Sequence, residues 1–187
     1  MAILKVAQMG HPVLRQVAAP VSEEERTSKD FLAFCQDLYE TMVEYDGVGI
    51  AAPQVHVPKR VVLAQLSDER GPEYLINPVI EVLDGPTMHT WEGCLSVEGI
   101  RGRVERPAHI RLRALGVDGG EKNYELEGFP AIVAQHECDH LDGVLYIDRA
   151  DPLSLAFLRE YEQFGPLVGE DEEEDEDGEL MDEGVDV

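Results

Sequence analysis

Apolar residues recur every three or four positions in three stretches of the chain, which is the spacing of a helix with one buried face. In the first stretch, Ser28 is placed to cap the start of a helix and Gly47 to end it. In the second, Pro130 suits the first turn and Gly143 suits the position after the last turn. The pattern therefore predicts three helices, over about residues 28–46, 130–142 and 151–165.

Between the first two predicted helices, short runs of β-branched and aliphatic residues alternate with turn signals such as Asp84-Gly85-Pro86. The predicted strands cover residues 60–66, 74–83, 89–97 and 110–115. These strands cluster in the middle of the chain and do not alternate with helices, which favours an α+β fold over a doubly wound parallel sheet. We therefore expect antiparallel or mixed sheets around a central second helix.

The acidic residues are concentrated at one end of the chain. Residues 170–187 hold 12 acidic side chains and no basic one, whereas residues 1–169 hold 27 acidic and 15 basic side chains. The tail cannot bury enough apolar surface to offset the entropy of ordering it, so we predict a folded domain over residues 1–169 and a disordered tail over residues 170–187. The net charge of −24 also argues against nucleic-acid binding, which depends on basic side chains that neutralise phosphates.

Neither a membrane span nor a signal peptide is predicted. No run approaches the roughly 20 apolar residues of a membrane helix, and Lys5 and His11 interrupt the N-terminal segment. The three cysteines, Cys35, Cys94 and Cys138, are too few and too scattered for a disulfide framework. We therefore expect a cytoplasmic protein with reduced thiols and no membrane contact.

The strongest chemical signal is the segment His136-Glu137-Cys138-Asp139-His140 inside the second predicted helix. Residues four apart lie about 40° apart around a helix, so His136 and His140 share one face and can hold one divalent ion. Glu137 is rotated by about 100° from His136, where a carboxylate can accept a proton from water on that ion. The alternative is that two surface histidines happen to stand four residues apart.

A catalytic metal site needs a third protein ligand. Cys138 lies about 200° around the helix from His136, and Cys35 follows the apolar pattern of the first helix, so both are predicted to be small buried residues. Cys94 stands in a Glu-Gly-Cys-Leu-Ser segment with polar neighbours. A Cys, His, His set would leave one position open for water, but spacing alone leaves the role of Cys94 undecided.

The segment Gly47-Val48-Gly49-Ile50-Ala51-Ala52-Pro53-Gln54 has glycines that let another group approach the backbone closely. Gln54 ends it with an amide that can donate to a developing oxyanion. The alternative for Gln54 is a loop amide that faces water.

Together the glycine-rich segment, the cysteine segment 92–96 and the segment 135–143 (QHECDHLDG) resemble the peptide deformylase family, in the same order and spacing. The opening segment 8–15 also resembles the family, and the likeness covers roughly residues 3–165. It implies removal of the formyl group from N-formylmethionyl peptides of nascent chains. It also implies one divalent ion, usually Fe²⁺ in the family, with Zn²⁺, Ni²⁺ or Co²⁺ as other candidates.

The resemblance also assigns roles by position. Glu137 takes a proton from the metal-bound water and delivers one to the leaving amine, while the Gln54 side chain and the Leu95 backbone N–H stabilise the oxyanion. The implied metal ligands are Cys94, His136 and His140. The implied substrate contacts are Val48, Gly49, Gly93, Arg101, Ile132 and Val133. Glu92 is a further candidate, as an acceptor that holds a metal ligand in place.

Two features depart from the family pattern. Glu98-Gly99 follows the cysteine segment where the family often has proline, which affects the preference for peptides. An acidic tail stands where some relatives have a basic helix that docks on the ribosome, so we expect only weak contact with the ribosome. We also expect a monomer. The five arginines between Arg101 and Arg113 are either another contact surface or an ordinary solvated strand face.

Two rival functions remain at this level. A metallo-endopeptidase would use similar chemistry but usually takes its third ligand from a histidine or glutamate. A non-enzymatic acidic protein would use its tail to bind cations or basic partners. An endopeptidase would cleave casein, whereas a deformylase would act on formyl-Met-Ala-Ser. Truncation after residue 169 would abolish the main activity of a protein that works through its tail, but not that of the enzyme.

Overall fold

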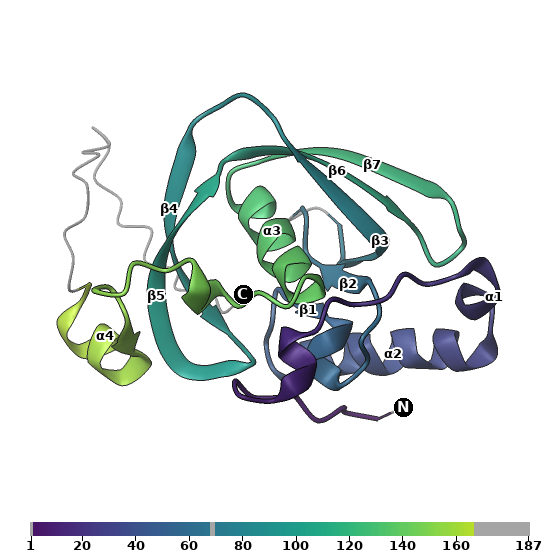
Figure 1. Cartoon of the computed structure of the whole chain (residues 1–187), viewed down its shortest axis with the longest axis horizontal. Coiled ribbons are helices and arrows are strands. Elements are labelled where there is room, and N and C mark those ends of the chain that lie inside the picture. Colours follow the sequence, from purple (N-terminus) through teal and green to yellow (C-terminus); the bar gives the residue numbers. More distant parts are fainter. Residues whose placement is uncertain (1, 68–69, 167–187) are drawn as a thin grey trace.

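The computed structural model describes residues 2–67 and 70–166 of the chain. It contains a five-stranded antiparallel sheet and a three-stranded antiparallel sheet, with one helix, α3, between them (Figure 1). The larger sheet has the order β1-β2-β3-β6-β7, and its strands are Gly49–Ala51, Val61–Ala64, Glu73–Val82, His109–Leu115 and Glu121–Glu127. The smaller sheet has the order β4-β5-β8, and its strands are Thr87–Cys94, Val97–Pro107 and Ala156–Phe157.

Four α-helices and three short 3₁₀ helices complete the described part of the chain. The α-helices are α1 (Glu23–Arg26), α2 (Lys29–Glu44), α3 (Phe129–Leu141) and α4 (Leu158–Phe164). The 3₁₀ helices are η1 (Pro12–Arg15), η2 (Ala52–Val55) and η3 (Tyr146–Asp148). The α+β fold with antiparallel sheets around a central helix is confirmed, whereas the predicted tail, residues 170–187, lies outside the described residues.

Helix α3 is the centre of the molecule, and ten of its 13 residues are buried. Pro130 lies in its first turn, as predicted. At its end Gly143 has a φ of 74°, and the N–H of Val144 donates to the carbonyl of Asp139 at 3.0 Å. This closure needs a residue with positive φ, which glycine adopts without strain. The predicted helix 130–142 is therefore confirmed to within a residue at each end.

Helix α2 begins where the sequence predicts, because the Ser28 hydroxyl accepts a hydrogen bond from the N–H of Phe31 at 3.2 Å. Its last residue, Glu44, comes two residues earlier than predicted. Asp46, with a φ of 52°, takes the left-handed position that we predicted for Gly47, and the Gly47 N–H donates to the carbonyl of Met42 at 3.0 Å. Aspartate tolerates this conformation better than most residues, so the helix closes before the glycine.

The third predicted helix, residues 151–165, is wrong in its first half. Asp151 instead opens a turn, in which its backbone carbonyl accepts hydrogen bonds from the backbone and hydroxyl of Ser154. Strand β8 follows, and only then does α4 run up to Gly165. The turn forms because the aspartate side chain also accepts the N–H of Leu153, an alternative to helical hydrogen bonding.

The apolar core has three parts. One lies between α3 and the larger sheet, a second beside the smaller sheet, and a third between α2, β1 and β2. None of the described helices combines the length and the apolar character needed to cross a bilayer.

Candidate metal centre

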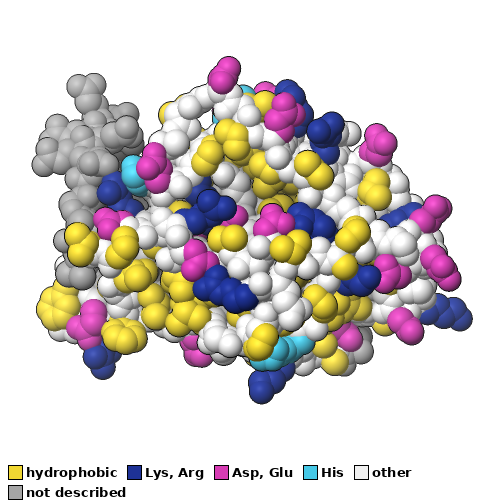
Figure 2. Space-filling view, in the orientation of Figure 1, with side chains coloured by type: hydrophobic (Ala, Val, Ile, Leu, Met, Phe, Trp, Pro, Cys, Tyr) yellow, Lys and Arg dark blue, Asp and Glu magenta, His cyan; other side chains and the backbone are white. Residues whose placement is uncertain are grey.

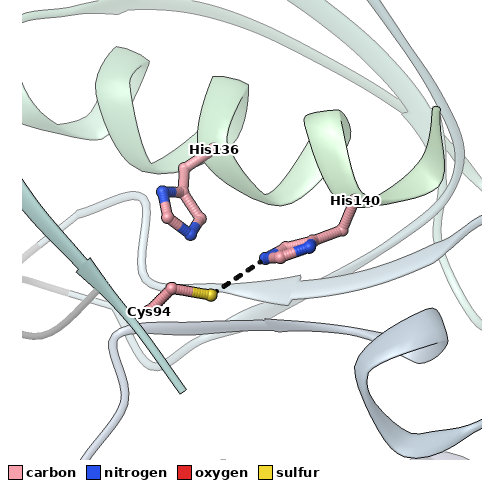
Figure 3. A group of neighbouring side chains, drawn as sticks. All are labelled: Cys94, His136 and His140. Atoms are coloured by element: carbon pink, nitrogen blue, oxygen red, sulfur yellow. Dashed lines mark hydrogen bonds between the residues drawn. The ribbon is translucent and has the colours of Figure 1, made fainter. Parts of the chain in front are cut away.

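Three potential metal ligands converge between α3 and the end of β4. His136 and His140 project from the same face of α3, and Cys94 is the last residue of β4 (Figure 3). One ligand atom from each residue lies within 4.8 Å of the other two, and Cys94 Sγ is 3.3 Å from His140 Nε2. All three side chains are buried. The structure thus places the thiol of Cys94 beside both imidazoles, which makes these three residues a candidate metal site.

The donor atoms of this centre fit a divalent metal ion. His136 Nε2 is buried and has no hydrogen-bond partner among the described residues, and the same holds for both carboxylate oxygens of Glu137. Buried polar atoms are almost always paired, because leaving them unpaired costs free energy. One thiolate and two imidazoles are ligands that zinc and iron accept, and three of them leave a fourth position open.

The protonation states of the free ligands depend on burial. Burial raises the pKa of the Cys94 thiol to about 12, although the Ser96 N–H donates to Sγ at 3.4 Å. Burial, together with the nearby His136, lowers the pKa of His140 well below its ordinary value. His140 is therefore neutral, as a metal-binding imidazole must be, while the thiol needs a cation beside it to ionise.

Glu92 contacts the Nδ1 nitrogen of the His136 ring. Its carboxylate oxygen Oε2 lies 2.8 Å from His136 Nδ1, so the Nδ1–H donates to it and Nε2 is left for a metal. Arg106 donates to both oxygens of the same carboxylate, at 2.6 and 3.0 Å. Burial alone would raise the pKa of Glu92, but the hydrogen bonds from His136 and Arg106 outweigh it and lower the pKa to about 2.

Glu137 follows His136 in α3 and lies inside the same buried region. It is fully buried, and burial, reinforced by the negative charge of Glu92, raises its pKa well above the ordinary value. Gly49 of β1 makes room for it, because a Cβ at Gly49 would lie 2.5 Å from Glu137 Oε1. The close approach that the glycine-rich segment suggests is therefore an approach to Glu137.

Gln54 and Leu95 flank the thiol. Gln54 in η2 is 1% exposed, so the alternative of a loop amide facing water is wrong. Its Oε1 accepts the N–H of Ala51 at 2.7 Å, which turns Nε2 toward Cys94 Sγ at 3.5 Å. Leu95 follows Cys94 in the turn between β4 and β5, and its carbonyl accepts a hydrogen bond from the side chain of Gln8.

The implied substrate contacts lie on several elements. Val48 precedes the edge strand β1, and Gly93 lies at a break in the register between β4 and β5. Ile132 and Val133 are fully buried in α3, about one turn before His136. Arg101 is buried in β5, in the stretch that pairs with β8.

The other thiols and the arginines are placed as follows. Cys35 in α2 and Cys138 in α3 are buried, as predicted, and burial raises the pKa of each. The expectation of a solvated arginine face is wrong for Arg101 and Arg106, which are 5% and 2% exposed. Arg106 is buried because it neutralises two buried carboxylates, those of Glu92 and Asp139. This role of Arg106 was not predicted from the sequence. The one signal there is the apolar Val104 two residues earlier, since residues two apart in a strand share a face.

Comparisons with known proteins agree with this geometry. The family model for polypeptide deformylase matches residues 3–156. Peptide deformylase of Leptospira biflexa serovar Patoc is 46% identical over 164 residues, which cover 83% of this chain and 92% of the relative. The Met-Ala-Ser-bound class I type b deformylase of Acinetobacter baumannii has a TM-score of 0.74 at 36% identity, with 79% of this chain and 98% of that chain covered.

A third relative, the crystal structure of peptide deformylase from Thermotoga maritima, has a TM-score of 0.75 at 39% identity and covers 81% of this chain and all of the other. The matched region contains the thiol, both imidazoles and Glu137, so sequence, fold and site agree. The chain therefore belongs to the polypeptide deformylase family, metal-dependent hydrolases that remove the N-terminal formyl group from nascent polypeptides.

Proposed function

We propose that Cys94, His136 and His140 hold a single Fe²⁺ ion and that Glu137 moves the protons of deformylation. The observation that carries the proposal is the unpaired, buried His136 Nε2 facing a thiol and a second imidazole. A bound divalent ion supplies Lewis acidity, which lowers the pKa of a coordinated water toward neutrality. Fe²⁺ is proposed over Zn²⁺, Ni²⁺ or Co²⁺ because it is the usual ion in the family.

Glu137 supplies the base and then the acid. Its carboxylate accepts a proton as water adds to the formyl carbon, and it returns that proton to the peptide nitrogen as the C–N bond breaks. Formate and a free N-terminal amine are the products. The raised pKa of Glu137 suits this cycle, because a carboxylate of ordinary pKa would be a weak acid catalyst near neutral pH.

Gln54 and Leu95 stabilise the negative charge that develops on the formyl oxygen. The Gln54 amide is already oriented, because the N–H of Ala51 holds its oxygen and leaves the NH₂ group toward the thiol. The Leu95 backbone N–H is proposed as the second donor. Donors that are fixed before the reaction need no reorganisation when the charge appears.

The peptide is proposed to extend the larger sheet at β1. This strand lies at the edge of that sheet, so the backbone around Val48 and Gly49 can pair with an added strand. Ile132 and Val133 are proposed as a wall of the methionine pocket, and Gly93 lets the peptide approach the cysteine segment. A contact of Arg101 with the peptide stays part of the proposal.

The setting of the reaction is also proposed. Residues 1–169 form the catalytic domain, and the acidic tail over residues 170–187 is dispensable for it. The protein acts as a cytoplasmic monomer on N-formylmethionyl peptides. Its contact with the ribosome is weak, because an acidic tail repels ribosomal RNA.

Metal analysis combined with a deformylation assay on formyl-Met-Ala-Ser tests the proposal. Cys94→Ala is expected to lose both the ion and the activity, whereas Glu137→Gln keeps the ion and loses the activity. One ion per chain in purified Cys94→Ala would contradict the ligand set. Hydrolysis of casein by the wild-type protein would favour the endopeptidase rival.

A further inference from the structure

Next to the metal centre, a chain of alternating charges connects His136 to the surface. It runs from Glu92 to Arg106, then to Asp139, and ends at Arg149, the residue that follows η3. Glu92 and Arg106 are almost completely buried, Asp139 is slightly exposed, and the Arg149 side chain is 47% exposed. Basic and acidic side chains also alternate across the middle of the face shown in Figure 2.

Arg149 fixes the outer end of this chain. Its Nε donates to Asp139 Oδ2 and its Nη2 to Oδ1, both at 2.7 Å. This bidentate contact sets the plane of the carboxylate, and Oδ2 also accepts Arg106 Nη1 at 2.8 Å. Arg106 is thereby held at both ends, since its Nε and Nη2 bind Glu92.

The charge chain ties together the elements that carry the metal ligands. Glu92 lies on β4, two residues before Cys94, while Asp139 lies on α3 between His136 and His140. Arg106 of β5 bridges the two carboxylates. The Asp139 carboxylate is therefore connected to the carboxylate that contacts His136 through a single side chain, that of Arg106.

We propose that Arg149 is a positioning residue of the metal centre: through Asp139 and Arg106 it holds Glu92, and Glu92 holds His136 in the orientation that binds metal. The proposal rests on the ligand set proposed above. Direct hydrogen-bond partners of metal ligands typically contribute about 10- to 100-fold to metal affinity, and Arg149 acts through three further contacts, so we expect about 5-fold.

Arg149→Ala tests this, with Arg60→Ala as the matched control. Arg60 lines the same surface cavity, of about 440 Å³, and its Nη1 donates to Asp142 at the end of α3, but it has no link to Glu92. Both variants thus lose an arginine–aspartate pair on α3. The proteins are loaded with Co²⁺, whose thiolate and d–d absorption bands report ligand geometry, and released metal is measured with an excess of chelator.

Arg149→Ala is expected to release Co²⁺ about 5-fold faster than wild type and to shift the d–d bands, whereas Arg60→Ala stays within about 2-fold. Faster release cannot come from the lost charge itself, because removing a positive group strengthens the hold on a cation. Ethylguanidinium, which fits the vacated part of the cavity, is expected to slow release in Arg149→Ala and not in Arg60→Ala. Arg149→Lys keeps the charge and one hydrogen-bond donor to Asp139, so its rate of Co²⁺ release is expected to lie between those of wild type and Arg149→Ala.

Equal release rates and spectra for Arg149→Ala and Arg60→Ala would overturn the inference, as would slower release from Arg149→Ala. Failure of the proposed function gives a different result. In that case the wild-type protein itself shows no thiolate band with Co²⁺, or a band that Cys94→Ser retains.

Discussion

Substitution of Gly49 by alanine probes most directly the geometry of Glu137, the proposed proton carrier. An added Cβ would lie 2.5, 2.8 and 2.9 Å from Oε1, Cγ and Cδ of Glu137, whereas ordinary contacts begin at 3.4 Å. Glu137 is fully buried, and the backbone of β1 is held on one side by its pairing with β2, so the side chain of Glu137 takes up most of the displacement. The carboxylate must therefore shift by about 1 Å or rotate away from the reacting water.

A misplacement of about 1 Å in a reacting group can cost about 10²-fold in rate, which corresponds to about 3 kcal/mol of transition-state stabilisation. We therefore expect Gly49→Ala to lower kcat on formyl-Met-Ala-Ser by about 10²-fold. The ion should be retained, since Gly49 is placed against Glu137 and not against a metal ligand. The double variant with Glu137→Gln should be no slower than Glu137→Gln alone, because both changes remove the same proton carrier.

Steady-state kinetics with metal analysis and a thermal unfolding scan provide the assay. Gly71→Ala is the matched control, because a Cβ there meets no atom within 4 Å. A folded, metal-loaded Gly49→Ala with kcat within threefold of wild type would refute the reasoning. So would a kcat loss of equal size in Gly71→Ala.

Four further outcomes are expected. Gln54→Leu should lower kcat by about 10²–10³-fold with metal content unchanged, and an unchanged kcat would exclude Gln54 as an oxyanion donor. The same variant should have a lower Tm, because the buried N–H of Ala51 loses its hydrogen-bond acceptor. The pKa of Glu92 is lowered from 4.5 to about 2 in the folded state, so ionised Glu92 adds about 3 kcal/mol to the free energy of unfolding. This contribution is present above pH 4.5 and is lost as the pH falls toward 2. Urea unfolding of metal-free protein at several pH values should show this loss, and Glu92→Gln should lack it. Chelation should abolish activity, and Fe²⁺ without oxygen should restore it; in air the Fe²⁺ form should decay with oxidation of Cys94, which mass spectrometry would detect. Truncation after residue 169 should leave kcat/KM within about twofold, and a large loss would favour a role for the tail in the main activity.

The helix that carries the metal ligands could be predicted from the sequence because its signals are local. The spacing of His136 and His140 fixes their common face, and Pro130 and Gly143 mark the ends of α3. Each of these signals acts within one or two turns of helix, so it does not depend on the rest of the fold. The convergence of Cys94 on the same site is different, because it requires that β4 end beside α3, and spacing alone could not decide it.

Strands β1, β5 and β7 were missed because their sequences do not look like strands. Strand β7, Glu121–Glu127, is an edge strand with four charged glutamate or lysine side chains besides Asn123, and of its seven residues only Leu126 is buried. Strand β5 contains two glycines and several charges, and β1 has only three residues. Hydrophobic periodicity detects strands with one apolar face, so strands that are short, at an edge or built around charges escape it.

Arg106 shows why the polar interior of the site could not be predicted. An arginine is normally assigned to the surface, because burying its charge alone is prohibitively costly. Here the charge is offset by Glu92, 14 residues earlier, and by Asp139, 33 residues later. These residues come into contact only when both sheets pack around α3. The partners that make burial favourable are therefore products of the fold. A site that places charged groups in a dry interior needs such partners. Predictions that assign charged residues to the surface are therefore least accurate around a buried functional site.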